Sequence, residues 1–344
     1  MSESPKIIGI DYALDDRHPY FKLRRGGVFS HASQLIGDDS RSILKSWLAA
    51  IKVGIKQDYE VVCVLSAGHG CMSRPNAYLK KIKWVISMWV RNLLIRFLLR
   101  DNDKKLIVID LVDDTTIAPI DSFLAKRCSL YYKRELCIDV IGSLERISPW
   151  WQHYGMAFND SWYKKIAPNL RPISLGIIEI PKLESYEREY DVFYVGNNRG
   201  FHRQRLAVEK ALKILHLEHG VKVYHPNKRL SKEDYWRALY SSKVSISPSG
   251  VGWDCFRHYE VAAAKTALCI SRPTIIASKP FLDGEECLYW DDVEDLVHSV
   301  LALLSDDDKR DAMVDKAYSK VTQQHTYEII KEDINQDVSR LLNK

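Results

Sequence analysis

The sequence predicts an α/β protein with two Rossmann-like domains that face each other across a cleft. Short β-rich runs alternate with amphipathic segments in both halves of the chain, as in parallel sheets wrapped by helices. A polar, unpatterned stretch at residues 181–189 separates the halves. The length of 344 residues, 46% hydrophobic and 28% charged, suits two folded domains and excludes disordered and collagen-like chains.

The carboxy-terminal half has the more regular pattern. Its expected strands cover residues 191–195, 221–224, 243–247 and 266–271. The expected helices between them cover residues 203–219, a segment opened at Ser231, and about residues 254–265. Gly220 ends the first helix, and Asp234 stands at the capping-box distance from Ser231. We expect the residues after this series to be mainly helical.

The amino-terminal half alternates less regularly. Its expected strands cover residues 7–10, 60–66, 105–111, 130–133 and 171–175. Helices are expected at about residues 41–55 and 77–100. We place the domain boundary between residues 180 and 181, so that the domains are residues 1–180 and 181–344, with a last helix able to cross back to the first domain. Ligands of such sheets bind at the carboxyl ends of the strands, so we look for chemistry on the strand-end loops.

Charge and cysteine usage exclude several classes of protein. The net charge is +5, but residues 1–180 hold 26 basic and 19 acidic side chains while residues 181–344 hold 24 and 26. Seven cysteines without a C-x-x-C pair indicate reduced thiols, not a zinc knuckle or a disulfide framework. No signal-peptide core and no apolar run of the ~20 residues needed for a spanning helix is visible. We expect a cytoplasmic protein that does not cross a membrane.

The densest candidate site follows the strand at residues 243–247. It contains two hydroxyls, two glycines and three charged side chains: Ser247, Ser249, Gly250, Gly252, Asp254, Arg257 and Glu260. A strand end followed by a glycine-containing turn and a helix start aims free N–H groups at a phosphate. The three charged residues are spaced by three, which puts them roughly on one helix face. The alternative is an ordinary βα turn in which Asp254 is the N-cap and Arg257 pairs with Glu260 at the surface.

This turn and the Asp254-x-x-Arg257-x-x-Glu260 spacing resemble the donor-binding segment of group-1 glycosyltransferases of the GT-B fold, which include spore-maturation-protein-like and exostosin-like members. The strand at residues 191–195 and the basic loop after it resemble that family's entry strand. The loop residues concerned are Gly196, Asn197, Arg199 and Arg203. Residues 131–135 and 171–176 also resemble the stretch that precedes this strand, so the likeness covers roughly residues 105–295.

The resemblance implies an enzyme that moves a sugar from a nucleotide-sugar donor to a surface glycan, lipopolysaccharide or glycolipid, in polysaccharide biosynthesis. Arg257 would neutralise the diphosphate and Glu260 would hold ribose or sugar hydroxyls, whereas Asp254 stands where a longer acid would complete the family's glutamate pair. Residues 181–344 would bind the donor and residues 1–180 the acceptor. The nucleotide sugar is a substrate, and neither a cofactor nor a bound metal is expected, because helix ends and basic side chains stabilise the departing phosphate.

Two other functions remain open. A nucleotide-sugar epimerase on the same scaffold would convert its ligand without an acceptor. A non-catalytic basic protein that binds nucleic acid is disfavoured, because the expected phosphate site lies in the acidic half of the chain.

An inverting enzyme needs a base in the first domain, and four residues qualify by their position near strand ends: Asp11, His69, Asp113 and Asp114. Adjacent carboxylates raise one another's pKa, which favours Asp113 and Asp114, although a capping role is also open for them. The D-x-D at residues 101–103 is interpreted as a solvated turn, and His216 and His219 as residues at a helix carboxyl end, not as metal ligands.

A basic amphipathic segment at residues 80–100 explains the net charge. Residues 74–105 hold nine basic and two acidic side chains, so the rest of the chain carries −2. An apolar stripe is expected on this helix, formed by Ile82, Ile86, Val90, Leu93 and Phe97. Two interpretations stay open: a helix that lies on an anionic membrane surface, and a helix that packs on the sheet while its basic side chains reach solvent.

Overall fold

The structure is a computed structural model. It describes residues 7–10, 51–52, 54–56, 59–66, 78–113, 115, 117, 121–136, 166–177, 180, 182, 186–196, 203–250 and 252–343. The chain divides into two compact units, residues 1–173 with 330–344, and residues 174–329. The boundary expected between residues 180 and 181 thus lies within the range of the second unit.

The first unit contains a parallel sheet whose strands lie side by side in chain order. Its strands are β1 (Ile7–Ile10), β2 (Val61–Leu65), β3 (Lys105–Asp110), β4 (Leu130–Lys133) and β5 (Leu170–Pro172). The helices between them are α4 (Tyr78–Leu98), α5 (Ser122–Arg127) and the short 3-10 helix η2 (Ala167–Asn169). Apolar side chains of β2 and β3 alternate, so that Val62, Val64, Leu106 and Val108 share one buried cluster with α4 and α5. Strands β1 to β4 lie within their predicted ranges, and β5 begins one residue earlier than predicted.

Helix α4 has two apolar faces. Leu94, Ile95 and Leu98 are buried in the core of the first unit. Ile86, Trp89 and Leu93 are 56%, 63% and 46% exposed. The expected single stripe is therefore wrong at Ile86 and Leu93, which lie on the outer face.

The buried face of α4 holds Arg91, which is 1% exposed. It forms an ion pair with the buried Asp121, and its Nη1 donates to the Leu65 carbonyl at 3.4 Å. An arginine can occupy the core-facing side of a helix when a carboxylate and a backbone acceptor satisfy it.

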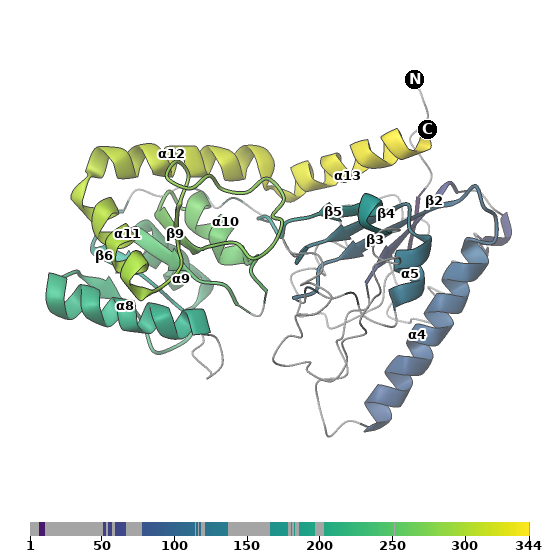
Figure 1. The fold of residues 1–344 in the computed structure, drawn as a ribbon, viewed down its shortest axis with the longest axis horizontal. Coiled ribbons are helices and arrows are strands. Elements are labelled where there is room, and N and C mark those ends of the chain that lie inside the picture. The colour runs from purple at the N-terminus through teal and green to yellow at the C-terminus, as the bar shows by residue number, and fades with distance from the viewer. Residues whose placement is uncertain are drawn as a thin grey trace. The chain divides into compact units, whose positions relative to one another are not determined.

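The second unit contains a second parallel sheet, in the strand order β10-β9-β8-β6-β7. These strands are β6 (Tyr190–Phe193), β7 (Val223–Tyr224), β8 (Ser242–Ser247), β9 (Ala267–Ser271) and β10 (Leu288–Trp290). Its helices are α8 (Arg203–His219), α9 (Lys232–Tyr240), α10 (Phe256–Ala263), α11 (Val293–Ser305) and α12 (Asp307–Gln324) (Figure 1). The last helix, α13 (Tyr327–Leu342), starts in the second unit and belongs to the first from Ile330 onward. Both sheets are parallel and carry helices in their connections, which confirms the predicted α/β class.

Chain order explains where the helices of the second unit lie. The step from β6 to β7 runs in one direction across the sheet, and the steps from β7 to β8 and from β8 to β9 run in the other. Because such crossovers are right-handed, α8 lies on one face and α9 and α10 lie on the opposite face. Helix α11 returns to the side of α8, and the two share a core with Val244 and Ile246 of β8.

The helix ends of the second unit follow local sequence rules. Gly220 ends α8 with φ +67°, a backbone conformation that L side chains rarely adopt. Ser231 caps α9 by accepting the Asp234 N–H at 3.0 Å, as predicted. His216 and His219 lie in the last turn of α8, and His216 Nδ1 is 3.2 Å from the Val221 carbonyl oxygen.

Helix α10 departs from its predicted start. It begins at Phe256 and its N-cap is Cys255, so the interpretation of Asp254 as the N-cap is wrong. The Asp254 carboxylate is used elsewhere: it accepts the Leu175 N–H at 2.7 Å and the Tyr259 hydroxyl at 2.6 Å.

The end of α4 leads into the D-x-D segment. Asp101 Oδ1 accepts the Asp103 N–H at 3.3 Å in a turn, as expected of a solvated turn. Within the described ranges, no helix is long and apolar enough to cross a bilayer.

Candidate functional site

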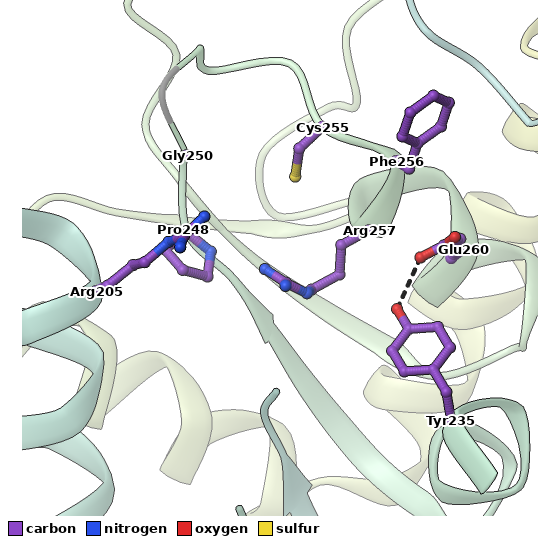
Figure 2. A pocket seen from close by; sticks show the side chains of 8 residues that line it. All are labelled: Arg205, Tyr235, Pro248, Gly250, Cys255, Phe256, Arg257 and Glu260. Carbon is purple, nitrogen blue, oxygen red and sulfur yellow. Dashed lines mark hydrogen bonds between the residues drawn. The ribbon is translucent and has the colours of Figure 1, made fainter. Parts of the chain in front are cut away.

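A pocket of about 350 Å³ lies in the second unit where the strand order reverses. The reversal is between β6 and β8, since the chain leaves β6 toward β7 and then returns to β8 on the other side. Loops that follow such neighbouring strands diverge and leave a crevice at the carboxyl edge of the sheet. The pocket is lined by Arg205, Tyr235, Pro248, Gly250, Cys255, Phe256, Arg257 and Glu260 (Figure 2).

The turn after β8 is held in place by hydrogen bonds to neighbouring elements. The Ser249 N–H lies 3.1 Å from Gln204 Oε1 of α8 and 2.9 Å from Ser271 Oγ of β9. Gly250 N–H donates to the Gly252 carbonyl at 2.9 Å. These contacts place the turn between the first turn of α8 and the end of β9.

Gly196 lies three residues after the end of β6, and its missing side chain leaves room for the Tyr194 side chain. A Cβ atom at residue 196 would lie 2.2 Å from the Tyr194 hydroxyl oxygen. The Arg257 guanidinium carbon lies 5.7 Å from the centroid of the same ring. Tyr194 thus fills the space that a side chain at residue 196 would need, next to the arginine.

Arg257 is one of the two arginines that line the pocket. Its Nε is buried, and within the part of the chain that the structure describes it makes no hydrogen bond. No ion pair to its guanidinium is found there either. A buried guanidinium nitrogen without a hydrogen-bond acceptor is costly unless an anion or another acceptor meets it.

Glu260 is oriented by a tyrosine of the neighbouring helix. The Tyr235 hydroxyl of α9 donates to Glu260 Oε2 at 2.7 Å (Figure 2). Burial raises the pKa of the Glu260 carboxyl, and the Tyr235 hydrogen bond and the Arg257 charge only partly oppose this. The alternative of an Arg257–Glu260 surface pair is therefore wrong, because Glu260 takes its hydrogen bond from Tyr235 inside a pocket.

The pocket combines features of an anion site with a carboxylate at its side. Arg205 and Arg257 both line it, and the N-terminal end of α10 borders it at Cys255 and Phe256. Helix N-termini and arginines favour phosphate groups. Glu260 can accept hydrogen bonds from hydroxyls of the same ligand.

The structure brings only part of the predicted donor set into the pocket. Gly250, Arg257 and Glu260 line it. Ser247 and Asp254 are buried and bonded within the unit, and Arg203 is exposed and does not line the pocket. Asn197 and Arg199 lie outside the described residues.

Sequence reasoning missed Arg205, Tyr235, Pro248, Cys255 and Phe256. Arg205 follows Arg203 by two residues, which turns its side chain to roughly the opposite side of α8. A helical wheel would have separated these two arginines. No local signal joins Tyr235 to Glu260, because 25 residues separate them in sequence.

Buried charges line the carboxyl ends of β3 and β4 in the first unit. Asp110 Oδ2 accepts the Lys133 ammonium at 3.0 Å and the Tyr131 hydroxyl at 2.9 Å. Arg134 donates to Glu135 Oε1 at 3.2 Å and forms an ion pair with Asp113. Lys133, Arg134 and Glu135 are each 1% exposed.

Asp113 is the one predicted base that the structure describes, and its side chain is 56% exposed and paired with Arg134. Asp11, His69 and Asp114 lie outside the described residues. Within the described ranges, no three metal-ligating side chains come together.

Residues 200–335 match the family described as "Glycosyl transferase-like". This segment contains the turn, α10 and all the residues that line the pocket. Residues 200–335 thus form a glycosyl transferase-like domain. The resemblance to group-1 glycosyltransferases is thereby confirmed for this segment. A search of curated proteins finds no match.

Solved structures support the GT-B fold of the chain. A glycosyltransferase from Rickettsia africae superposes with a TM-score of 0.58 at 10% identity, with 99% of each chain covered. HepE of Anabaena, crystallised with UDP and glucose, gives a TM-score of 0.53 at 11% identity over 98% of this chain and 100% of that one. The chain spans 58% of the length of TarM and 61% of the matched chain of the GtfA/B complex. At these identities the likeness establishes the fold.

Proposed function

We propose that the glycosyltransferase domain binds a nucleotide diphosphate sugar in the described pocket and that the protein transfers the sugar to a glycan or glycolipid acceptor. The observation that carries this proposal is Arg257, whose buried Nε makes no hydrogen bond to the described residues, at the carboxyl edge of a parallel sheet beside Arg205 and the start of α10. A diphosphate supplies the anionic oxygens that this cation lacks.

The residues that line the pocket have different roles in the proposed transfer. Arg257 and Arg205 bind the diphosphate, and their charge stabilises the nucleotide diphosphate as the bond to the sugar breaks. Glu260, held by Tyr235, accepts hydrogen bonds from ribose or sugar hydroxyls. These groups are fixed before the reaction, so they need little reorganisation as charge develops.

Uridine diphosphate hexoses are the favoured donors. HepE, which shares the fold over nearly the whole chain, was crystallised with UDP and glucose. Because phosphate charge can be balanced by Arg257 and Arg205, we propose transfer without a bound metal, which unchanged turnover in EDTA would support.

Calorimetry and thermal denaturation with UDP, GDP, CMP, UDP-glucose and uridine test the proposal on the full chain. We expect UDP and a UDP-hexose to raise the melting temperature in proportion to occupancy, and uridine to have little effect. Absence of binding by every nucleotide diphosphate would overturn the assignment.

Incubation of a labelled UDP-hexose without acceptor separates transfer from epimerisation. An epimerase converts the donor sugar under these conditions, whereas a glycosyltransferase leaves it intact or slowly hydrolyses it. A non-catalytic nucleic-acid binder would show binding to duplex DNA with a steep salt slope.

We also propose that the first unit lies on an anionic membrane surface through α4, as suits an enzyme acting on a glycolipid. The outer face of α4 presents Ile86, Trp89 and Leu93, followed by the exposed Arg96 and Arg100. These positions fall on one helical face. Apolar side chains flanked by cations are typical of helices at an anionic lipid interface.

A further inference from the structure

Cys255 lines the proposed donor pocket but has no part in the proposed binding of donor. Its Sγ lies 3.6 Å from Nδ1 of His258 and 3.6 Å from Oγ of Ser247. His258 is 1% exposed and Ser247 is fully buried, whereas Cys255 is partly exposed toward the pocket (Figure 2). A nucleophilic atom thus faces the pocket while its polar neighbours lie behind it.

The tautomer of His258 follows from its second hydrogen bond. Nε2 lies 2.9 Å from the Trp253 carbonyl oxygen, which can only accept, so Nε2 carries a hydrogen. In the neutral ring Nδ1 is then an acceptor, and it faces the Ser247 hydroxyl at 2.8 Å and the Cys255 thiol. The thiol proton therefore has a base to receive it, directly or through the Ser247 hydroxyl.

Electrostatics agree with this geometry. Burial alone would raise the pKa of Cys255, but His258, Arg257 and the Ser247 hydroxyl outweigh it and lower the pKa to about 7. Burial alone would lower the pKa of His258, but the neighbouring Cys255 and Asp254 outweigh it and raise the pKa. The lowered pKa of Cys255 and the raised pKa of His258 both favour a thiolate beside an imidazolium.

The other described cysteines provide an internal contrast. Cys63, Cys128, Cys269 and Cys287 are all buried. Burial raises the pKa of Cys128 and of Cys269 to about 12, and raises the pKa of Cys63 and Cys287 as well. Within the described part of the chain, Cys255 alone combines access to a pocket with a nearby base.

We propose that Cys255 is a thiol-modification site for small, carboxylate-bearing disulfides, and that the resulting mixed disulfide fills the donor pocket and blocks the nucleotide sugar. The part of this proposal in which the mixed disulfide blocks the nucleotide sugar rests on the proposed function. The anionic preference follows from Arg205 and Arg257, whose two positive charges exceed the single carboxylate of Glu260 in the same pocket. Transfer would then stop under oxidising conditions and resume when a thiol restores Cys255.

The chemistry balances without a further reactant. The Cys255 thiolate attacks one sulfur of the disulfide, the S–S bond of that disulfide breaks, and a new S–S bond forms to Sγ. The released thiolate takes a proton from the His258 imidazolium or from water. The disulfide is the oxidant, Cys255 is oxidised, and one small thiol is the reduced product.

The test measures modification by mass spectrometry, independently of activity. The full chain is treated with iodoacetamide between pH 5.5 and 9, and the rate at each cysteine-containing peptide is followed, with the peptides of Cys71 and Cys137 resolved separately. We expect the Cys255 rate to follow a titration centred near pH 7, and at pH 7 to exceed that of an ordinary exposed thiol by roughly threefold. If Cys255 is labelled no faster than Cys128 or Cys269, the proposal that it is a thiol-modification site is wrong.

Three disulfides then test the charge preference: oxidised glutathione, which is anionic, hydroxyethyl disulfide, which is neutral, and cystamine, which is cationic. We expect the Cys255 adduct to form fastest with glutathione disulfide and slowest with cystamine, and to be absent in Cys255→Ser. The reverse order would overturn the proposed ligand class. The variant His258→Asn should slow labelling at pH 7, and the pH profile of the unaltered chain gives the same information if this variant does not fold.

UDP binding distinguishes this proposal from the proposed function. If UDP binds the reduced chain and not the adduct, and dithiothreitol restores binding, both proposals are supported. If the adduct forms and UDP still binds to it, the blocking role is wrong. If UDP never binds, the donor assignment fails while the labelling rates still decide whether the thiol site exists.

Discussion

Tyr235 of α9 donates its hydroxyl hydrogen to Oε2 of Glu260 on α10 at 2.7 Å, and so fixes the carboxylate at the side of the pocket. The bond favours the ionised carboxylate, whereas burial of Glu260 raises its pKa. Tyr235→Phe removes the bond, so the pKa of Glu260 rises further and the carboxylate is protonated at higher pH. We expect the affinity for a UDP-sugar, measured by calorimetry between pH 5 and 8, to fall off at a higher pH in this variant than in the unaltered chain. At a pH below both pKa values, a pKa higher by one weakens binding by up to about tenfold.

The control for that prediction is Glu260→Gln, which cannot titrate. Its affinity should be lower at pH 8 and nearly independent of pH. Superimposable pH profiles for Tyr235→Phe and the unaltered chain would show that Tyr235 does not govern the ionisation of Glu260.

Arg257 is predicted to strengthen UDP binding through contacts with the diphosphate. Arg257→Ala should weaken UDP binding by roughly 10- to 100-fold, the range expected for lost hydrogen bonds to a charged group. Arg257→Lys should recover only part of this, because an ammonium lacks the planar fork of a guanidinium. Calorimetry with UDP and uridine measures both effects, and uridine binding should not change.

Arg229→Ala is the matched control, since Arg229 is exposed and does not line the pocket. Its UDP affinity should stay within about twofold of the unaltered chain, as for most surface substitutions. An Arg257→Ala variant that binds UDP normally would remove the central support for the donor site.

Local patterns predicted most of the fold. The strand β8 and the capping by Ser231 were visible because alternation and capping depend on residues a few positions apart. The candidate site could be predicted from the sequence only in part. Arg257 and Glu260 lie on one helix, but Arg205 enters the pocket through the rotation of α8 against the sheet, which the sequence of α8 alone does not determine.

Charged residues explain the remaining errors. Asp254 looked like an N-cap beside a helix start, but its partner Leu175 is 79 residues away. The basic side chains of the segment at residues 80–100 were expected to face solvent or a membrane surface, but Arg91 pairs in the core with Asp121, 30 residues away. Tertiary partners of this kind override what local spacing favours.

The buried Lys133–Asp110 pair is predicted to matter for stability. Lys133→Met leaves the Asp110 carboxylate in the core without its cation, and removal of one partner of a buried pair costs about 3–5 kcal/mol. Urea denaturation should show this loss, and hydrogen exchange should quicken in β3 and β4. The double variant Lys133→Met with Asp110→Asn should be more stable than Lys133→Met alone, and Lys213→Met, at an exposed site on α8, should be neutral. Equal stability of the single and double variants would contradict a charge effect.

The exposed face of α4 gives a prediction about membranes. Trp89→Ser with Leu93→Ser removes the two side chains that would enter the lipid, and burial of each is worth roughly 1.5–3 kcal/mol. Sedimentation with vesicles containing phosphatidylglycerol should therefore show binding reduced by more than about tenfold. Arg96→Glu should weaken binding mainly at low salt, because the attraction between surface charges is screened. The control Leu217→Ser, at a leucine of α8 that is 79% exposed, should bind as the unaltered chain does. Binding that is unchanged in the double variant would mean that the outer face of α4 does not enter the lipid. Equally strong binding to neutral vesicles would contradict the proposed preference for an anionic surface.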